Sequence, residues 1–452
     1  MAAPAAAQTN KVEVYKDDTG FKLKVDGKDL MVLGMNWTYV PIGENYNYSL
    51  WTKSDDYIRE ALDREMRLFT QMGGNALRIY VGIPKKWIQY LYEKHGVYTI
   101  LNHPLARYGM SIDGVWTFPT NYQDPRTREL VRAEVAELVK EYKDTPGLLM
   151  WLLGNENNYG LVWKTTEIED LPVEEANSAR AEHLYSLFGE VIRDIKKLDP
   201  NHPVSMANGD LGYIDLIVKH CQGLDIMGSN VYRGASSGDL FQVVKDKLDL
   251  PFLYTEFGSD AYNAKEKRED SEAQAEYVRA LWQEIYEQSH GKGRVGNAIG
   301  GLTFQWSDGW WKYRQEINLD VQDTNASWAN GGYEFDHVEG ENNMNEEWFG
   351  VCAKGPTDSE GFFDLYPRPA YYVLQHGYKQ DPYAPTTTLA TIREHWAIDP
   401  STLSASYDAR VAKEKLRELE LLRIENLRME FRYYATDGNG LDDDERESRR
   451  FE

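Results

Sequence analysis

The chain repeatedly alternates short apolar runs with amphipathic helical stretches, and this alternation limits the folds that it can adopt. Eight apolar runs, which are typical of buried strands, occur at 31–37, 76–81, 98–101, 148–153, 203–207, 224–229, 252–255 and 298–306. Helical periodicity follows at 56–72, 85–95, 125–144, 173–198, 213–220, 240–247, 270–288 and 367–376. Eight strand–helix units predict an α/β fold, a (β/α)8 TIM barrel. A doubly wound open sheet shows the same alternation and is the alternative.

Residues before and between these units add detail to the predicted barrel. Residues 11–29 alternate apolar and polar positions around turn residues, which predicts an N-terminal β-hairpin that caps the barrel. Two loops are unusually long, 102–124 after the third strand and 307–366 after the eighth. We expect their tryptophans to form walls of a binding cleft, with packing of the loops on themselves as the alternative. These tryptophans are Trp116, Trp310, Trp311, Trp328 and Trp348.

The composition divides the chain into three parts. Residues 1–10 are predicted to be a disordered N-terminal remnant, 11–380 the barrel, and 381–452 a linker, a charged helix over 408–431 and an acidic tail. The apolar spacing of that C-terminal helical extension suits docking on its own barrel or on a second copy, as a homo-oligomer. The opening MAAPAAAQTN resembles the stretch around a signal-peptidase site. We therefore expect an exported, periplasmic or extracellular protein, with a plain disordered tail as the alternative.

Charge and cysteine content disfavour several kinds of partner. The chain has 50 basic and 73 acidic residues, a formal charge of −23, which repels phosphate backbones and anionic lipids. We expect no nucleic-acid partner, and no membrane insertion because no apolar run is long enough. Cys221 and Cys352 are the only cysteines and have no metal-ligand spacing, so we predict neither metal nor cofactor. DGNGLDDDE has Leu441 where a calcium loop needs a ligand, and we interpret it as a solvated tail.

Two of the predicted strands end in a glutamate. LLMWLLGNENN over 148–158 places Glu156 after the fourth strand, and FLYTEFG places Glu256 at the end of the seventh. Barrel enzymes hold their catalytic groups at the carboxyl ends of the strands, so both glutamates are expected at the barrel mouth. Paired carboxyls in this position suit retaining glycoside hydrolysis, in which one attacks and the other protonates the leaving oxygen. Taken singly, each could instead be a buried salt-bridge partner.

Together, GNE and YTEFGSDA resemble the catalytic motifs of the retaining (β/α)8 glycosidase clan, most closely the catalytic domain of glycoside hydrolase family 2. The resemblance covers roughly residues 20–376. It implies that Glu156 is the general acid/base and Glu256 the nucleophile. The β-sandwich domains that usually precede the barrel in this family have no counterpart in the first thirty residues.

The same resemblance implies roles for further residues. Arg78 in NALRIYV is similar to the clan arginine that keeps the nucleophile ionised, and Asn155 to the asparagine that binds the sugar 2-hydroxyl. Tyr232 in SNVYRG is similar to the tyrosine that positions the nucleophile, and Trp306 in GGLTFQW to the tryptophan beneath the reacting sugar. Three more residues after strand ends are expected in the pocket: Asn36, Trp37 and His103.

These residues predict a retaining β-glycoside-active enzyme that works by double displacement on β-glucan or β-glucooligosaccharides. The 13 Trp and 30 Tyr suit stacking on sugar rings, and the lack of an obvious basic cluster disfavours uronic acids, although Lys312 and Arg314 weaken that argument. A sugar acceptor in place of water would make the same pair a transglycosylase, a glucosyltransferase. A protein that binds carbohydrate without catalysing a reaction is the alternative to an enzyme.

Overall fold

The protein is described by a computed structural model in which residues 9–80, 82–162 and 171–403 are placed. Several predicted features lie outside the described residues. They are most of the N-terminal remnant (residues 1–8), the last residue of the expected strand 76–81, the expected helix 408–431 and the acidic tail. The chain divides into two compact units, Met1–Ser401 and Thr402–Glu452. All the helices and strands named below belong to the first unit.

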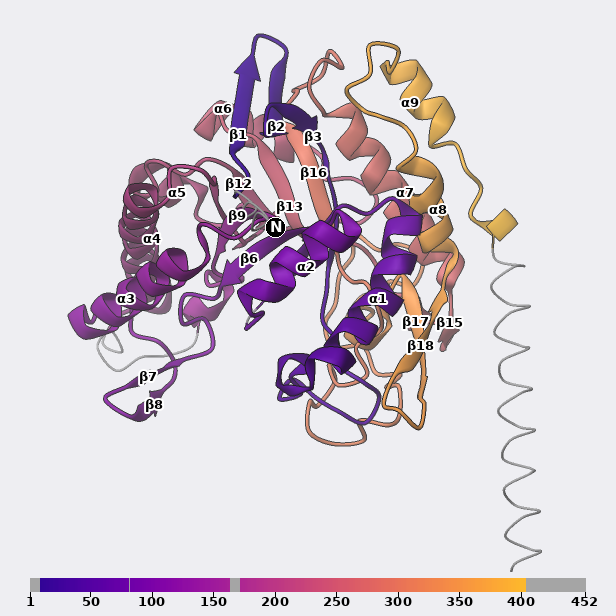
Figure 1. Ribbon diagram of the computed structural model, residues 1–452, viewed down its shortest axis with the longest axis horizontal. Helices are drawn as coiled ribbons and strands as arrows, with labels where there is room; N and C mark the ends of the chain where they lie inside the picture. Colours follow the sequence, from indigo (N-terminus) through magenta and orange to yellow (C-terminus); the bar gives the residue numbers. More distant parts are fainter. Residues whose placement is uncertain (1–8, 81, 163–170, 404–452) are drawn as a thin grey trace, which may run out of the picture. The chain divides into compact units, whose positions relative to one another are not determined.

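Parallel strands form the centre of this unit (Figure 1), and their pairing closes them into a ring. Its strands are β4 (Val32–Asn36), β5 (Ala76–Ile79), β6 (Tyr98–His103), β9 (Leu148–Leu153), β10 (Val204–Met206), β11 (Asn208–Gly209), β12 (Met227–Asn230), β13 (Phe252–Phe257) and β16 (Ala298–Thr303). Neighbours in the chain pair in parallel, and β16 pairs back onto β4. The fifth strand is split: β10 pairs with β9 and β11 with β12. The bridge between Ser205 and Ile226 joins its two sides. The predicted barrel is therefore confirmed, and the open sheet is excluded.

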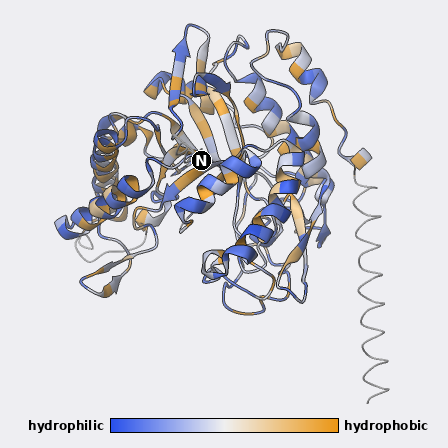
Figure 2. Cartoon of the chain, in the orientation of Figure 1, coloured by the Kyte–Doolittle hydropathy of each residue, from blue (hydrophilic) through white to orange (hydrophobic). Residues whose placement is uncertain are grey.

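Helices surround this ring at the predicted places. They are α1 (Asp55–Met72), α2 (Lys85–His95), α3 (Pro125–Tyr142), α4 (Val173–Leu198), α5 (Ile214–His220), α6 (Leu240–Leu248), α7 (Ser271–Glu287) and α8 (Pro369–Gly377). Hydrophobic residues concentrate on the central strands, whereas the helices carry both kinds (Figure 2), as expected when only one helix face is buried. A further helix, α9 (Leu389–His395), follows the barrel. Trp396 after it is fully buried against Tyr286 of α7, so the compact unit extends beyond the boundary expected at Gln380.

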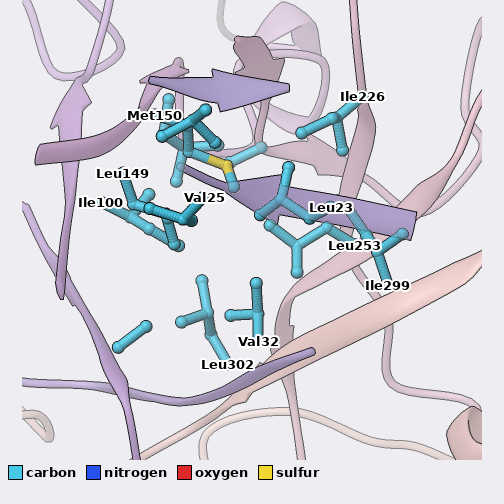
Figure 3. Close-up of a cluster of buried hydrophobic side chains, with 14 of the residues drawn as sticks. Leu23, Val25, Val32, Ile100, Leu149, Met150, Ile226, Leu253, Ile299 and Leu302 are labelled. Atoms are coloured by element: carbon cyan, nitrogen blue, oxygen red, sulfur yellow. The ribbon is translucent and has the colours of Figure 1, made fainter. Parts of the chain in front are cut away.

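A small antiparallel sheet closes the amino-terminal end of the barrel. It consists of β1 (Val12–Asp17), β2 (Gly20–Val25) and β3 (Lys28–Leu30), so the predicted hairpin gains a third strand. Leu23 and Val25 of β2 pack with barrel residues such as Ile100 and Leu253 in one hydrophobic cluster (Figure 3). Because this end is filled with apolar side chains, the polar residues of the barrel interior gather at the opposite end.

The two long loops contain their own short strands at that opposite end. The first holds β7 (Met110–Ile112) and β8 (Val115–Thr117), and the second holds β17 (Cys352–Thr357) and β18 (Phe363–Pro367). Short pieces complete the fold: β14 (Tyr262–Asn263), β15 (Arg268–Glu269), and the 3-10 helices Leu50–Thr52, Tyr159–Val162 and Glu346–Trp348. Arg368 anchors the second loop through a buried bidentate pair with Asp308, with N–O distances of 2.7 and 2.8 Å. Arg368 also pairs with Glu269 at 2.8 Å, so truncating Arg368 would remove the cation shared by both carboxylates.

The loop tryptophans have different environments. The ring of Trp348 packs on Tyr262 and its N–H donates to the carbonyl of Asp323, so this tryptophan packs within the loops. Trp328 lies edge-on against Tyr232, with ring centroids 5.6 Å apart. Trp116 on β8 is 66% exposed. Packing of the loops on themselves is therefore confirmed for Trp348, whereas the expectation that loop tryptophans form walls of a cleft stays a prediction.

Candidate active site

Strand geometry decides which predicted residues reach the barrel interior. Successive side chains of a strand point to opposite faces, so each strand end offers one inward residue and one outward neighbour. Asn36 at the end of β4 faces inward, and its amide donates to the carbonyls of Thr255 (3.0 Å) and Leu302 (2.9 Å). Asn102 of β6 also faces inward, where its Oδ1 accepts two bonds from Arg78 (2.9 and 2.7 Å).

Arg78 of β5 is the hub of the interior polar residues. Its side chain is fully buried, and one terminal nitrogen donates to Oε1 of Glu256 at 2.9 Å. The other terminal nitrogen donates to Oδ1 of Asn155 at 2.8 Å. A guanidinium has five donors in a fixed plane, so it fixes the spacing between the ends of β13 and β9. The structure thus brings together Arg78, Asn155 and Glu256, as predicted.

The carboxylate of Glu256 is buried and accepts bonds from three side chains. Besides Arg78, the hydroxyl of Tyr80 donates to Oε1 at 2.7 Å, and the hydroxyl of Tyr232 donates to Oε2 at 3.2 Å. Oε1 therefore accepts two short bonds, whereas Oε2 accepts one longer bond. The three donors hold this carboxylate in one orientation and leave Oε2 as its less engaged oxygen.

Glu156 has a much sparser environment. It follows β9 in a left-handed backbone conformation with φ of 53°, and its N–H donates to the carbonyl of Ala207. Its carboxyl accepts one bond from the amide of Asn230, at 3.1 Å. Burial and, secondarily, the negative charge of Glu256 raise the pKa of Glu156 to about 7. A carboxyl with this pKa retains its proton up to near-neutral pH.

Four residues of the site were missed by sequence reasoning: Tyr80, Asn102, Tyr108 and Asn230. Tyr80 and Asn230 each lie two residues from a predicted site residue, Arg78 and Tyr232 respectively, and period-two spacing could have found them. Asn230 donates to Glu156 and accepts from the hydroxyl of Thr255 at 2.7 Å, so it links the two strand ends. Tyr108 accepts from the amide of Asn155 at 2.9 Å. It lies in a long loop, where no strand period could have located it.

The expectation that Trp37 and Trp306 belong to the pocket is wrong. Both are almost fully buried and face helix α1 on the outside of the barrel. The indole N–H of Trp37 donates to the carboxyl of Glu65, and Trp306 packs edge-on against Phe69 with ring centroids 5.5 Å apart. Trp37 is the outward neighbour of the inward-facing Asn36. Trp306 is fully buried between the barrel and α1, so no sugar can stack on its ring.

The prediction for His103 is wrong for the same reason. Its neighbour Asn102 occupies the inward position, so the imidazole points toward the outer layer. There its Nδ1 accepts from the N–H of Leu105 at 3.1 Å, and its Nε2 lies 3.8 Å from a carboxyl oxygen of Glu134 on α3. Burial lowers the pKa of His103 to about 4. It is a neutral structural residue outside the site.

The assembled residues can perform acid/base and nucleophilic chemistry. One glutamate is held by three donors and the other keeps a proton, which is the division that double displacement requires. Within the described residues, no group of three or more His, Cys, Asp or Glu side chains could hold a metal ion. The helices of these described residues also include none with the length and hydrophobicity of a membrane span.

Comparison with known families agrees with this geometry. Residues 57–296 match the family described as glycosyl hydrolases family 2, TIM barrel domain. The chain belongs to glycosyl hydrolase family 2. The matched segment contains Arg78, Asn155, Glu156, Tyr232 and Glu256. The family resemblance inferred from the two glutamate motifs is thereby confirmed.

Individual relatives of this family 2 chain are distant. It is 24% identical over 290 residues to a probable mannan endo-1,4-beta-mannosidase C of Aspergillus terreus, covering 56% of this chain and 65% of that one. It is 25% identical over 142 residues to a beta-galactosidase of Lactococcus lactis, covering 31% of this chain and 12% of that one. This chain therefore spans less than two thirds of either relative.

Solved structures show the same fold at low identity. A Parabacteroides merdae beta-glucuronidase with glycerol in its active site aligns with a TM-score of 0.51 at 15% identity, over 82% of this chain and 40% of that chain. A Bacteroides uniformis beta-glucuronidase aligns with a TM-score of 0.52 at 15% identity, over 82% and 37%. At this level of identity, the similarity concerns the barrel fold.

Proposed function

We propose that this family 2 chain is a retaining β-glycosidase that acts by double displacement on β-linked glucan or glucooligosaccharides. The single observation that carries the proposal is the unequal environment of its two glutamates. Glu256 accepts bonds from Arg78, Tyr80 and Tyr232, whereas Glu156 accepts one bond and has a pKa raised to about 7. A salt-bridge role alone would not require this pairing of a well-anchored and a sparsely bonded carboxyl.

In the first step, Glu256 attacks the anomeric carbon of the sugar. Oε2 is the attacking atom because Oε1 is engaged by two short bonds. As the new C–O bond forms, the bond to the leaving oxygen breaks, and Glu156 transfers its proton to that oxygen. The products are a sugar ester of Glu256, a free leaving alcohol and an ionised Glu156.

In the second step, Glu156 acts as a base. Its carboxylate takes a proton from water, the water oxygen attacks the anomeric carbon, and the ester bond to Glu256 breaks. Asn155 assists both steps: one amide N–H is used by Tyr108, and the second can donate to the sugar 2-hydroxyl. A sugar hydroxyl in place of the water would give transfer with the same groups.

The preference for neutral glucans rests on composition and on the charges near the site. A chain with a charge of −23 and many aromatic residues suits neutral sugars better than anionic ones. Two cations bear on this argument: the Nε of Arg107 donates to the carbonyl of Asn155 at 3.2 Å, and the Nζ of Lys312 lies 5.0 Å from the ring centre of Phe304. The alternative substrates are those in the names of the relatives: mannans, galactosides and glucuronides.

A substrate panel with an inactive control tests the proposal. The purified chain is incubated with β-glucooligosaccharides, β-mannooligosaccharides, β-galactosides and β-glucuronides, and products are analysed for shorter and longer chains. We expect cleavage of the gluco-series by the wild type and none by Glu256→Gln. Preferred cleavage of another series would overturn the sugar assignment, and turnover retained by Glu256→Gln would overturn the mechanism.

A further inference from the structure

A hairpin with exposed aromatic side chains lies at the same end of the barrel as the two glutamates. It consists of β7 and β8, joined at Asp113 and Gly114, whose φ values of 50° and 83° suit a tight hairpin turn. Trp116 and Phe118 are 66% and 50% exposed. Figure 1 shows β7 and β8 at the opposite end of the barrel from β1–β3. Exposed apolar groups that lie together are typical of binding surfaces.

Tyr108 connects this hairpin to the catalytic residues. Its hydroxyl accepts a bond from the amide of Asn155, the residue directly before Glu156. Burial and the charges of the two glutamates raise the pKa of Tyr108, although the residue as a whole is 55% exposed. The polar tip of Tyr108 therefore lies in the site, while much of its ring faces the open side.

Trp116 lies beside the backbone that follows Tyr108. A Cβ on Gly109 would lie 3.0 Å from two ring atoms of Trp116, and Gly109 has a positive φ of 97°. The indole therefore packs over the backbone directly after Tyr108, at a position where only glycine leaves room. Side chains at the base hold the loop: the hydroxyl of Tyr122 donates to the carbonyl of Leu105 at 3.1 Å, and Arg126 pairs with Asp113 at 3.2 Å.

We propose that Tyr108 and Trp116 form a stacking platform for sugars on the leaving-group side of the cleaved bond. This inference rests on the proposed function, because Glu156 protonates the leaving oxygen and the leaving group must therefore lie on its side. Flat aromatic rings bind the apolar faces of neutral sugars. The substrates are accordingly β-linked chains that extend past the cleaved bond, and glycosides of small alcohols are poor substitutes for them.

A comparison of two substrate types tests the platform. For the wild type and for Trp116→Ala, kcat/KM is measured on a β-glucooligosaccharide series of increasing length and on a 4-nitrophenyl β-glucoside. We expect Trp116→Ala to lower the ratio of oligosaccharide to aryl-glycoside kcat/KM about tenfold, mainly through KM. Val115→Ala is the matched control, because Val115 is 67% exposed on the same hairpin and offers no aromatic ring. It should keep the wild-type ratio.

The outcomes separate this inference from the proposed function. A wild type that cleaves both substrate types, with an unchanged ratio in Trp116→Ala, would overturn the platform and leave the glutamate mechanism intact. The platform would also be overturned if Trp116→Ala only converted a dimer into a monomer by light scattering, which would make the hairpin an interface between copies. Absence of cleavage by the wild type on every glycoside would overturn the proposed function itself.

Discussion

The ends of β9 and β13 carry the same side chain in opposite environments. At the end of β13, Glu256 meets a guanidinium and two tyrosine hydroxyls, all of them donors. At the end of β9, Glu156 meets one amide, and its pKa is raised to about 7 by burial and by the charge of Glu256. The barrel therefore differentiates two identical groups through neighbouring strands, since Arg78 comes from β5 and Asn230 from β12.

Removing the carboxylate at the β13 end should have the largest effect. Glu256→Gln keeps the size of the side chain but cannot form a stable sugar ester, so kcat should fall on the order of 10⁴-fold or more. Steady-state kinetics on the best glycoside of the panel measures this. Glu287→Gln is the control, because Glu287 is a buried glutamate that lies outside the site. Its carboxylate pairs with Arg393 at an N–O distance of 2.9 Å. Comparable losses in both variants would indicate general damage and contradict the assignment.

Removing the carboxyl at the β9 end should have an effect that depends on the leaving group. Glu156→Gln cannot donate a proton, so kcat/KM should fall roughly 10²–10⁴-fold on oligosaccharides. An aryl glycoside with an acidic phenol leaves without protonation, and its first step should fall much less. Pre-steady-state measurement on both substrates separates the two. Equal losses on both would argue against Glu156 as the acid.

The pH dependence of the reaction should report the raised pKa at the β9 end. Glu156 must be protonated for the first step, and its pKa is about 7. As pH rises through that value the protonated fraction falls, so kcat/KM should drop about tenfold per pH unit above it. Titration of kcat/KM on an oligosaccharide checks this, and the alkaline decline should be absent in Glu156→Gln. A decline that persists unchanged in the variant would assign it to another group.

Removing single hydroxyl donors at the β13 end should have the smallest effects on kcat. The loss should be larger for the donor with the shorter hydrogen bond to Glu256. Tyr80→Phe removes a bond of 2.7 Å to Glu256 and should lower kcat about tenfold, because hydrogen bonds to charged groups contribute roughly 1.5–3 kcal/mol. Tyr232→Phe removes a bond of 3.2 Å and should cost less. Tyr286→Phe is the control, because its buried hydroxyl has no partner within the described residues. A reversed order of Tyr80 and Tyr232 would show that distance does not rank these donors.

Much of the fold follows from the sequence because barrel strands buried on both faces appear as continuous apolar runs. All eight expected strands and helices are present, with β9 at the bounds expected. The split of the fifth strand into β10 and β11 could not be foreseen, since it depends on pairing with two different neighbours. Nor could the burial of Trp396 against α7, which depends on where the chain returns after the barrel.

The sequence predicted site residues well where a motif contains a single candidate. It predicted them poorly where two adjacent residues could each face the barrel interior. GNE and YTEFG identify the glutamates because each stands alone at a strand end. In the pairs Asn36–Trp37 and Asn102–His103, only the strand's pleat decides which member faces the interior, and in both pairs it is the asparagine. The prediction for Trp306 was wrong for the same reason, since its indole faces outward and packs on Phe69 of α1.

The stereochemistry of the first product distinguishes double displacement from a single displacement. If Glu256 attacks and Glu156 then activates water, two successive inversions restore the β configuration at the anomeric carbon. Proton NMR of a β-glycoside mixed with a high enzyme concentration should therefore show the β-anomer of the released sugar first, with the α-anomer appearing later through mutarotation. Initial release of the α-anomer would contradict double displacement and, with it, the roles assigned to the two glutamates.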